Sequence, residues 1–183
     1  MTAVSQIRRV LLALIFFAAL AAGLFLGLRH YREHRYDRLI QTAASRYGLD
    51  PALVSAVIWR ESLYRADCLG SAGEIGLMQV REPAGREWAH ASSIRNFEKS
   101  HLADPGTNIL AGSWYLARAL HRWEGRDDPA PFALAEYNAG LTHARRWAAM
   151  PGAETGAGFI NAVTFPTTRA YINTILTRYR KTR

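Results

Sequence analysis

The stretch "DPALVSAVIWRES" (residues 50–62) predicts an amphipathic helix whose last turn carries a carboxylate. Asp50 suits the N-cap and Pro51 fits the first helical turn. Four apolar residues then share one helical face: Leu53, Val54, Val57 and Ile58. Glu61 is the next residue on that face, so the helix places a carboxylate over its own apolar stripe.

A carboxylate in this place has two interpretations. Near a helix end, Glu61 could be exposed or paired with Arg60 or Arg65. In an apolar cleft, desolvation would disfavour its ionised form and raise its pKa. A carboxylic acid that stays protonated near neutral pH can donate a proton to a leaving group, as glycoside cleavage requires. The residues around Glu61 leave both interpretations open.

The composition indicates one globular domain without a metal site. The chain has 183 residues, of which 49% are hydrophobic and 21% charged. Cys68 is the only cysteine, and the six histidines form no HExxH-like pair, so we expect no metal. The net charge of +8 comes from scattered basic residues. This pattern favours a solvated basic surface, then attraction to an acidic polymer, and we expect no nucleic-acid partner.

The N-terminus predicts a membrane segment. Val10–Leu28 is an uncharged apolar run of 19 residues, close to the ~20 that span a bilayer. A cleaved signal peptide is the alternative, because "ALA" at residues 19–21 could be a cleavage site. The apolar run continues beyond it, which favours an uncleaved signal-anchor. Arginines flank both ends, and the positive-inside rule would, if anything, leave the rest of the chain in the cytoplasm.

The remainder of the chain is expected to be helical. We assign residues 1–32 to the anchor with its basic flank, and residues 33–183 to one all-α domain. Glycine-containing residues 63–75 and 152–158 are predicted as loops, and "GLMQV" (76–80) as the start of a short helical turn. No period-2 pattern of useful length predicts a strand.

Five short elements occur in one order along the chain. They are "WRES" (59–62), "GLMQ" (76–79), "NIxxGxxYL" (108–116), "YNAG" (137–140) and "TRxYI" (168–172). Together they resemble the soluble lytic transglycosylase family of peptidoglycan-cleaving enzymes, which is related in fold to goose-type lysozyme. The resemblance covers roughly residues 36–180 and implies a lysozyme-like single domain. Together with the apolar run near the N-terminus, the expected fold is an all-α, lysozyme-like single domain with an N-terminal transmembrane helix.

The resemblance also implies a reaction. Glu61 would be the sole catalytic acid and base, protonating the glycosidic oxygen between N-acetylmuramic acid and N-acetylglucosamine. It would then accept the proton of the muramic acid C6 hydroxyl, which closes a 1,6-anhydro ring without water or a cofactor. The enzyme would be a carbon–oxygen lyase anchored in the inner membrane and facing the periplasm, or secreted or periplasmic after signal cleavage. The alternatives are a lysozyme-like hydrolase and a non-catalytic glycan-binding module of an envelope assembly.

The same resemblance implies that six residues contact the glycan. Gly76 would let the backbone approach a sugar, and Gln79 would hydrogen-bond acetamido or hydroxyl groups. Met78 is expected to line the cleft, and the Tyr137 phenol to hydrogen-bond Glu61. The full set is Ser62, Gly76, Met78, Gln79, Tyr137 and Asn138, although Asn138 could equally cap its helix.

A hydrolase would need a second carboxylate beside the acid, about 5–5.5 Å away for retention or ~6.5–9.5 Å for inversion. Glu136 adjoins Tyr137, but neighbouring helical residues point about 100° apart. We therefore expect Glu136 to face solvent or a basic neighbour such as Arg145. Glu74 lies in the glycine-containing loop and is expected to be exposed, so the sequence predicts no second catalytic carboxylate.

Five positions depart from the family pattern, and one of them is Glu82, which stands where "GLMQxMP" has its proline. The serine that the family carries nine residues after the glutamate is Gly70 here, and a loop proline is Ala66. The second methionine of "GLMQxMP" is Arg81, and the glutamate of the terminal "ETR" is Thr167. These departures concern contacts with the substrate, not the fold or Glu61.

Overall fold

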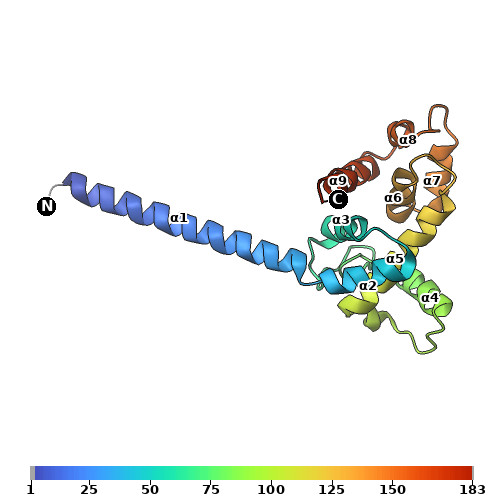
Figure 1. Cartoon of the computed structure of the whole chain (residues 1–183), viewed down its shortest axis with the longest axis horizontal. Coiled ribbons are helices and arrows are strands. Elements are labelled where there is room, and N and C mark those ends of the chain that lie inside the picture. Colours follow the sequence, from blue (N-terminus) through green and yellow to red (C-terminus); the bar gives the residue numbers. More distant parts are fainter. Residues whose placement is uncertain (1–2, 183) are drawn as a thin grey trace. The chain divides into compact units, whose positions relative to one another are not determined.

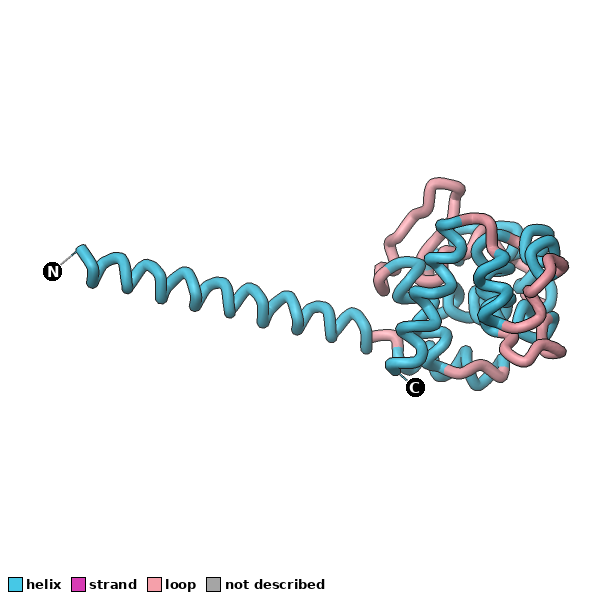
Figure 2. Tube along the Cα trace, turned by 90° about the horizontal axis from the view of Figure 1, so that it is seen from above, coloured by secondary structure: helices cyan, strands magenta, loops and turns pink. Residues whose placement is uncertain are grey.

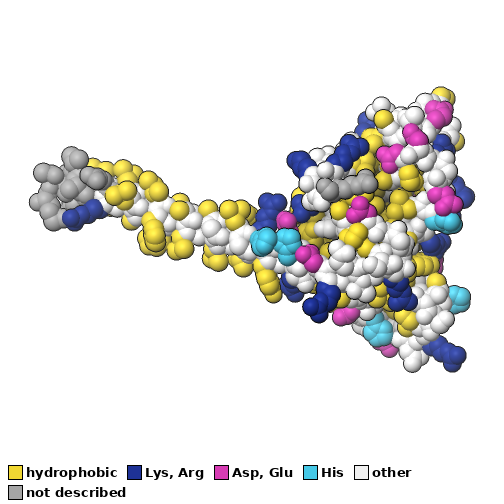
Figure 3. Space-filling view, in the orientation of Figure 1, with side chains coloured by type: hydrophobic (Ala, Val, Ile, Leu, Met, Phe, Trp, Pro, Cys, Tyr) yellow, Lys and Arg dark blue, Asp and Glu magenta, His cyan; other side chains and the backbone are white. Residues whose placement is uncertain are grey.

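The computed structural model describes residues 3–182, which divide into two units at residues 36 and 37. The first unit contains helix α1 (Ala3–His34). Its side chains from Val10 to Leu28 are exposed, and they are almost all apolar (Figure 3). By length and composition α1 is a candidate membrane span, a description that a signal sequence also fits.

The second unit is built of helices and loops (Figures 1 and 2). Its elements are α2 (Asp37–Tyr47), α3 (Pro51–Ser62), α4 (Glu82–Ala91), the 3₁₀ helix η1 (Lys99–Ala103), α5 (Pro105–Arg122), α6 (Ala130–Ala139), α7 (Leu141–Ala148), α8 (Gly156–Ala162) and α9 (Pro166–Thr182). Over residues 3–182 no strand is formed, which confirms the predicted all-α class.

Helix α6 is the centre of this unit. Every residue from Pro131 to Glu136 is buried, as expected for a helix that is apolar on all sides. It packs against α5, α7, α8 and α9, while α3 packs against α2 and α9 (Figure 1). The ring of Phe132 stacks on Phe159 of α8, with centroids 4.0 Å apart. The carboxylate-bearing helix α3 is therefore held between the first and last helices of the unit.

Two local predictions are wrong. Residues 76–80 form a turn instead of a helical start, because Gly76 (φ 76°) and Gln79 (φ 48°) both adopt left-handed backbone conformations. Paired backbone hydrogen bonds between Ile75 and Val80 close this turn, at 3.0 and 3.1 Å. Residues 156–158, predicted as the end of a loop, instead begin α8. The Thr155 hydroxyl caps this helix by accepting a hydrogen bond from the Gly158 N–H at 3.1 Å.

The side chain of Asn108 holds the turn against α5. Its Oδ1 accepts a hydrogen bond from the Met78 N–H at 2.8 Å. Its Nδ2 donates to the carbonyl oxygens of Ile75 (2.7 Å) and Leu102 (2.8 Å). A Cβ on Gly76 would lie 2.6 Å from that nitrogen, so only glycine leaves room for the amide. Asn108 is buried, and it satisfies three backbone groups that would otherwise lack partners.

We expect Asn108→Ala to lower the free energy of unfolding by about 3 kcal/mol, because three buried backbone groups lose their partner. Chemical denaturation of the full chain in detergent micelles would measure this. Asn173→Ala, at an exposed position of α9, is the control and should change stability by less than about 0.5 kcal/mol. Equal effects of the two substitutions would contradict the role given to Asn108.

Candidate active site

A cleft of about 490 Å³ opens beside the C-terminal end of α3. Its wall is formed by α3, the loop that follows it, the start of α4, the middle of α5 and the end of α6. The lining residues are Glu61, Gly70, Ser71, Glu74, Gln79, Val80, Arg81, Ala84, Gly112, Tyr115, Glu136, Tyr137, Asn138, Ala139 and Gly140. Four of the five sequence elements contribute to this single cleft, with Glu61 on its wall.

The chain reverses sharply just after Glu61. Leu63 (φ 52°) and Tyr64 (φ 60°) are consecutive non-glycine residues in the left-handed region, where such residues are uncommon. The buried Tyr64 ring turns back to α3, and its hydroxyl lies 2.6 Å from the Ser55 hydroxyl. This contact fixes the end of the helix, and with it the position of Glu61 in the last turn.

The environment of Glu61 favours its protonated form. The side chain is partly buried, and desolvation is the main reason why its pKa is raised from 4.5 to about 7. The negative charge of Glu74 raises it further, whereas the Tyr171 hydrogen bond and the charge of Arg60 lower it. Arg65 does not pair with Glu61, since it lies 3.6 Å from Asp67. Near neutral pH Glu61 can therefore donate a proton and then accept one.

The phenol that binds Glu61 is Tyr171, not Tyr137. The Tyr171 hydroxyl, from α9, donates to Glu61 Oε1 at 2.6 Å. The Tyr137 hydroxyl instead donates to the Met78 carbonyl at 2.8 Å, so the expected bond from Tyr137 to Glu61 is absent. Burial raises the pKa of both phenols well above 10, and the nearby Glu61 charge adds to this. Both tyrosines thus stay protonated as hydrogen-bond donors.

Three expected glycan contacts lie behind the cleft wall. The Ser62 hydroxyl is buried and donates to the carbonyl oxygens of Ile58 (3.1 Å) and Leu77 (2.8 Å). The Met78 side chain is fully buried against Gly112, so the expectation that it lines the cleft is wrong. The missing side chain of Gly76 makes room for Asn108, not for a sugar. These residues build the cleft without reaching its surface.

Gln79 and Asn138 do line the cleft. The Gln79 amide nitrogen donates to the carbonyl oxygens of Cys68 (3.1 Å) and Gly76 (2.8 Å). Both of its N–H groups are therefore hydrogen-bonded to the backbone of the loop. Its carbonyl oxygen is the group it can offer to a ligand. Asn138 is exposed, and its Oδ1 accepts a hydrogen bond from Thr168 at 2.8 Å. Its amide nitrogen is thereby oriented at the edge of the cleft.

The two candidate second carboxylates differ in their outcome. Glu136 faces a basic neighbour as expected, although this neighbour is Arg122 and not Arg145. The Glu136 side chain is buried, and its two oxygens accept hydrogen bonds from Arg122 (3.1 Å) and Trp123 (2.8 Å). Glu74 is not exposed, because it is partly buried and lines the cleft with Glu61. The expectation for Glu74 is therefore wrong. Among residues 3–182 no Lys, Arg or His side chain forms a salt bridge with Glu74, whereas Glu136 pairs with Arg122.

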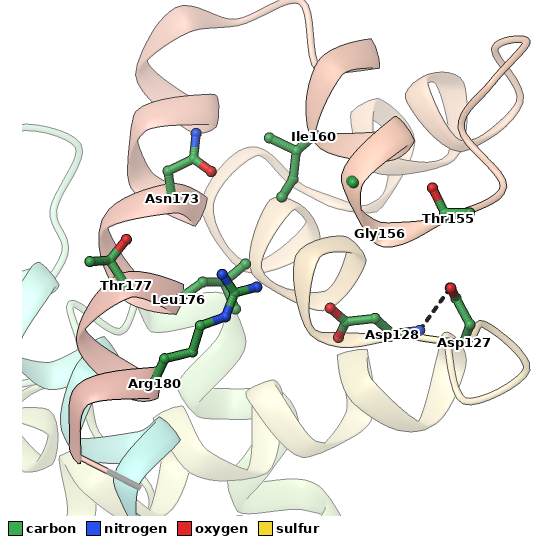
Figure 4. Close-up of a pocket in the computed structure, with 10 residues that line it drawn as sticks. Asp127, Asp128, Thr155, Gly156, Ile160, Asn173, Leu176, Thr177 and Arg180 are labelled. Carbon is green, nitrogen blue, oxygen red and sulfur yellow. Dashed lines mark hydrogen bonds between the residues drawn. The ribbon is translucent and has the colours of Figure 1, made fainter.

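A second hollow of about 380 Å³ lies between α8, α9 and the loop before α6 (Figure 4). Asp128 and Arg180 point into it from opposite sides, and Ile160 and Asn173 line another part of its wall (Figure 4). It shares no lining residue with the cleft, and its wall contains no aromatic side chain. The combination of a partly buried acid with aromatic neighbours therefore assigns the candidate site to the cleft around Glu61.

The sequence matches the family model of the transglycosylase SLT domain over residues 38–159. The chain belongs to this family. The matched SLT region contains Glu61, Gln79 and Tyr137 but ends before Tyr171 in α9. The helix that carries the hydrogen-bond partner of Glu61 thus lies outside the matched region.

Relatives of this SLT domain include larger proteins. The membrane-bound lytic murein transglycosylase F of Desulfosudis oleivorans is 36% identical over 117 residues, covering 62% of this chain and 24% of that protein. The membrane-bound lytic murein transglycosylase C of Mannheimia succiniciproducens is 31% identical over 151 residues, covering 80% of this chain and 38% of that protein. The chain spans between about a quarter and two fifths of the length of these relatives.

Solved structures of SLT proteins share the fold. The 70 kDa soluble lytic transglycosylase of Escherichia coli superposes with a TM-score of 0.72 at 26% identity, over 80% of this chain and 24% of that one. A complex of the 70 kDa soluble lytic transglycosylase with bulgecin A superposes with a TM-score of 0.75 at 25% identity, over 90% of this chain and 27% of that one. These matches confirm the lysozyme-like architecture predicted from the sequence.

Two residues of the site were not identified from the sequence. Tyr171 lies in the "TRxYI" element, but its place on the apolar stripe of α9, with Ile172 and Ile175, made it look like a core residue. Glu74 carried no signal, because a single acidic residue in a glycine-containing loop is usually solvated. The signal that could have identified Tyr171 is its place in the "TRxYI" element, since the other four elements all contribute residues to the cleft.

The raised pKa of Glu61 predicts a pH-dependent stability. Folding makes this carboxyl hold its proton more tightly, so the folded state loses relative stability as the pH rises from about 4.5 through 7. Glu61→Gln has no proton to lose. We expect the stability of wild type relative to Glu61→Gln to fall by up to about 3 kcal/mol between pH 4 and pH 8. Denaturant unfolding of both proteins at several pH values measures it; a constant difference would contradict the raised pKa.

Proposed function

We propose that this protein is a peptidoglycan lytic transglycosylase that uses Glu61 as its only catalytic acid and base. The observation that carries the proposal is the partly buried Glu61 carboxyl in an open cleft, with a pKa of about 7 and a hydrogen bond from Tyr171. Membership of the SLT family and the names of the relatives support it.

The reaction proceeds in two proton transfers. Glu61 gives its proton to the glycosidic oxygen as the bond between that oxygen and C1 of N-acetylmuramic acid breaks. The resulting carboxylate accepts the proton of the C6 hydroxyl of the same sugar while that oxygen bonds to C1. The products are a new sugar 4-hydroxyl and a 1,6-anhydromuramic acid end, and Glu61 has regained its proton.

The other cleft residues position the glycan in this proposal. The carbonyl oxygen of Gln79 accepts a hydrogen bond from a sugar N–H or O–H group, and the Asn138 amide donates one. Tyr115 and Tyr137, whose rings meet edge to face at 5.9 Å, provide an aromatic surface on the wall. No tryptophan lines the cleft, so sugar stacking does not rest on the five tryptophans of the chain.

We expect Glu61→Gln to abolish lysis of purified cell walls while the domain keeps its fold, because glutamine cannot deliver a proton. Turbidity loss measures lysis, and circular dichroism in micelles verifies the fold. Asp67→Asn, an exposed carboxylate of the next loop, is the control that should leave activity unchanged.

Mass spectrometry of the wild-type digest separates this function from its alternatives. Ends of the 1,6-anhydro form are expected. Reducing muramic acid ends as the main product would identify a hydrolase, and substantial lysis by Glu61→Gln would remove Glu61 from the reaction. Binding of cell walls without any release of soluble fragments would identify a glycan-binding module.

We further propose that α1 anchors the domain to the inner membrane with residues 33–183 in the periplasm, where the substrate lies. The exposed apolar surface of α1 and the membrane-bound relatives support this. Uncleaved protein should sediment with membranes and resist high-salt extraction but not detergent. A mature N-terminus near Ala22 in a soluble periplasmic fraction would show cleavage instead.

A further inference from the structure

Gly70 and Glu74 occupy one place in the cleft wall. A Cβ added to Gly70 would collide with Oε2 of Glu74 and would lie 2.9 Å from the Glu74 Cβ. It would also lie 2.8 Å from Oε1 of Gln79, so the Glu74 carboxylate and the Gln79 amide oxygen together fill the space beside position 70. Gly70 has no left-handed backbone conformation, so its lack of a side chain is required by these neighbours and not by the turn itself.

The loop holds the Glu74 carboxylate in that place. The Gly70 N–H donates to the Glu74 carbonyl at 2.8 Å, and the Gly73 N–H donates to the Gly70 carbonyl at 3.2 Å. The Ala72 N–H donates to Glu74 Oε2 at 2.9 Å. The next residue, Ile75, bridges to both Leu69 and Val80. A closed turn therefore presents Glu74 to the cleft in a defined position.

We propose that Glu74 is a positioning residue of the active site, which the absent side chain at position 70 admits to the cleft, and that its negative charge adds to the burial of Glu61 in favouring the proton-donating form. This inference rests on the proposed function. Two like charges in one cleft cannot both be formed without an electrostatic cost, so the ionised Glu74 disfavours ionisation of Glu61. The effect has the sign that an acid catalyst working near neutral pH requires.

Other groups of the cleft act on Glu61 as well. Those that face it or line the same cleft are Arg60, Arg81, Tyr115, Tyr137, Tyr171 and Glu136. The Glu136 charge is compensated by the Arg122 guanidinium, 3.1 Å away. Arg60 and the Tyr171 hydrogen bond both favour the carboxylate form of Glu61. The charge of Glu74 acts in the other direction and favours the protonated form of Glu61.

The test measures the ionisation of Glu61 directly. The full chain is labelled with glutamate carrying ¹³C at the carboxyl group and studied by NMR in detergent micelles, and the Glu61 signal is assigned by its loss in Glu61→Gln. Glu74→Gln should lower the pH midpoint of Glu61 by about half a pH unit. Gly70→Ala, whose Cβ displaces the Glu74 carboxylate, should lower it by a smaller amount. Asp67→Asn removes an exposed charge from the same loop and should not move it.

A double substitution isolates the coupling. If position 70 acts through Glu74, Gly70→Ala should cause no further change once Glu74→Gln is present. The pH above which cell-wall lysis declines should fall in parallel with the NMR midpoint in each variant. A purely structural role for Glu74 would reduce stability and activity at every pH without moving either midpoint.

Failure of the inference about Glu74 and failure of the proposed function give different results. An unchanged Glu61 midpoint in Glu74→Gln, or a Gly70→Ala effect that persists in the double variant, overturns the inference. If the midpoints shift as expected but the wild-type protein releases no soluble wall fragments at any pH, the electrostatic coupling stands and the proposed function fails.

Discussion

The cleft depends on the buried amide of Asn108. Its three hydrogen bonds, to Met78, Ile75 and Leu102, join α5 to the turn at residues 76–80. That turn carries Gln79 on the cleft wall, and its Met78 carbonyl receives the Tyr137 hydroxyl from α6. One polar side chain thus fixes the relation between the central helices and an irregular loop, which apolar packing alone could not orient so closely.

Helix α9 completes the environment of Glu61. The α3 helix packs on α9, and Tyr171 reaches from α9 to the Glu61 carboxyl. The α9 residue Thr168 also fixes the Asn138 amide at the edge of the cleft. Glu61 and Asn138 therefore share supports in the last helix, although the region that matches the family model ends before it. A truncation at the end of that region would remove both supports.

The sequence predicted the helices because each carries its own periodic stripe and end signals. Asp50 caps α3 through a 2.8 Å bond to the Ala52 N–H, and Asp104 caps α5 in the same way through Thr107. The site was less predictable. A stripe shows that Tyr171 is buried but not that a carboxyl lies opposite it, because that contact joins residues 110 positions apart. In the same way, Met78 and Ser62 belong to the right elements, yet the turn geometry directs their side chains to the interior.

Position 70 shows why departures from a family pattern should be interpreted in pairs. Taken alone, Gly70 in place of a serine removes a polar group from the cleft and makes a non-catalytic module more plausible. In the folded chain the Glu74 carboxylate fills the space that a side chain at position 70 would need, so a polar group is exchanged and not lost. The exchange also replaces a neutral hydroxyl by a charge next to the acid Glu61. Arg81 adds a cation on the same wall, where the family carries methionine. The cleft is therefore more polar than the family pattern implies, and under the proposed function the glycan would meet more charge and less apolar surface there.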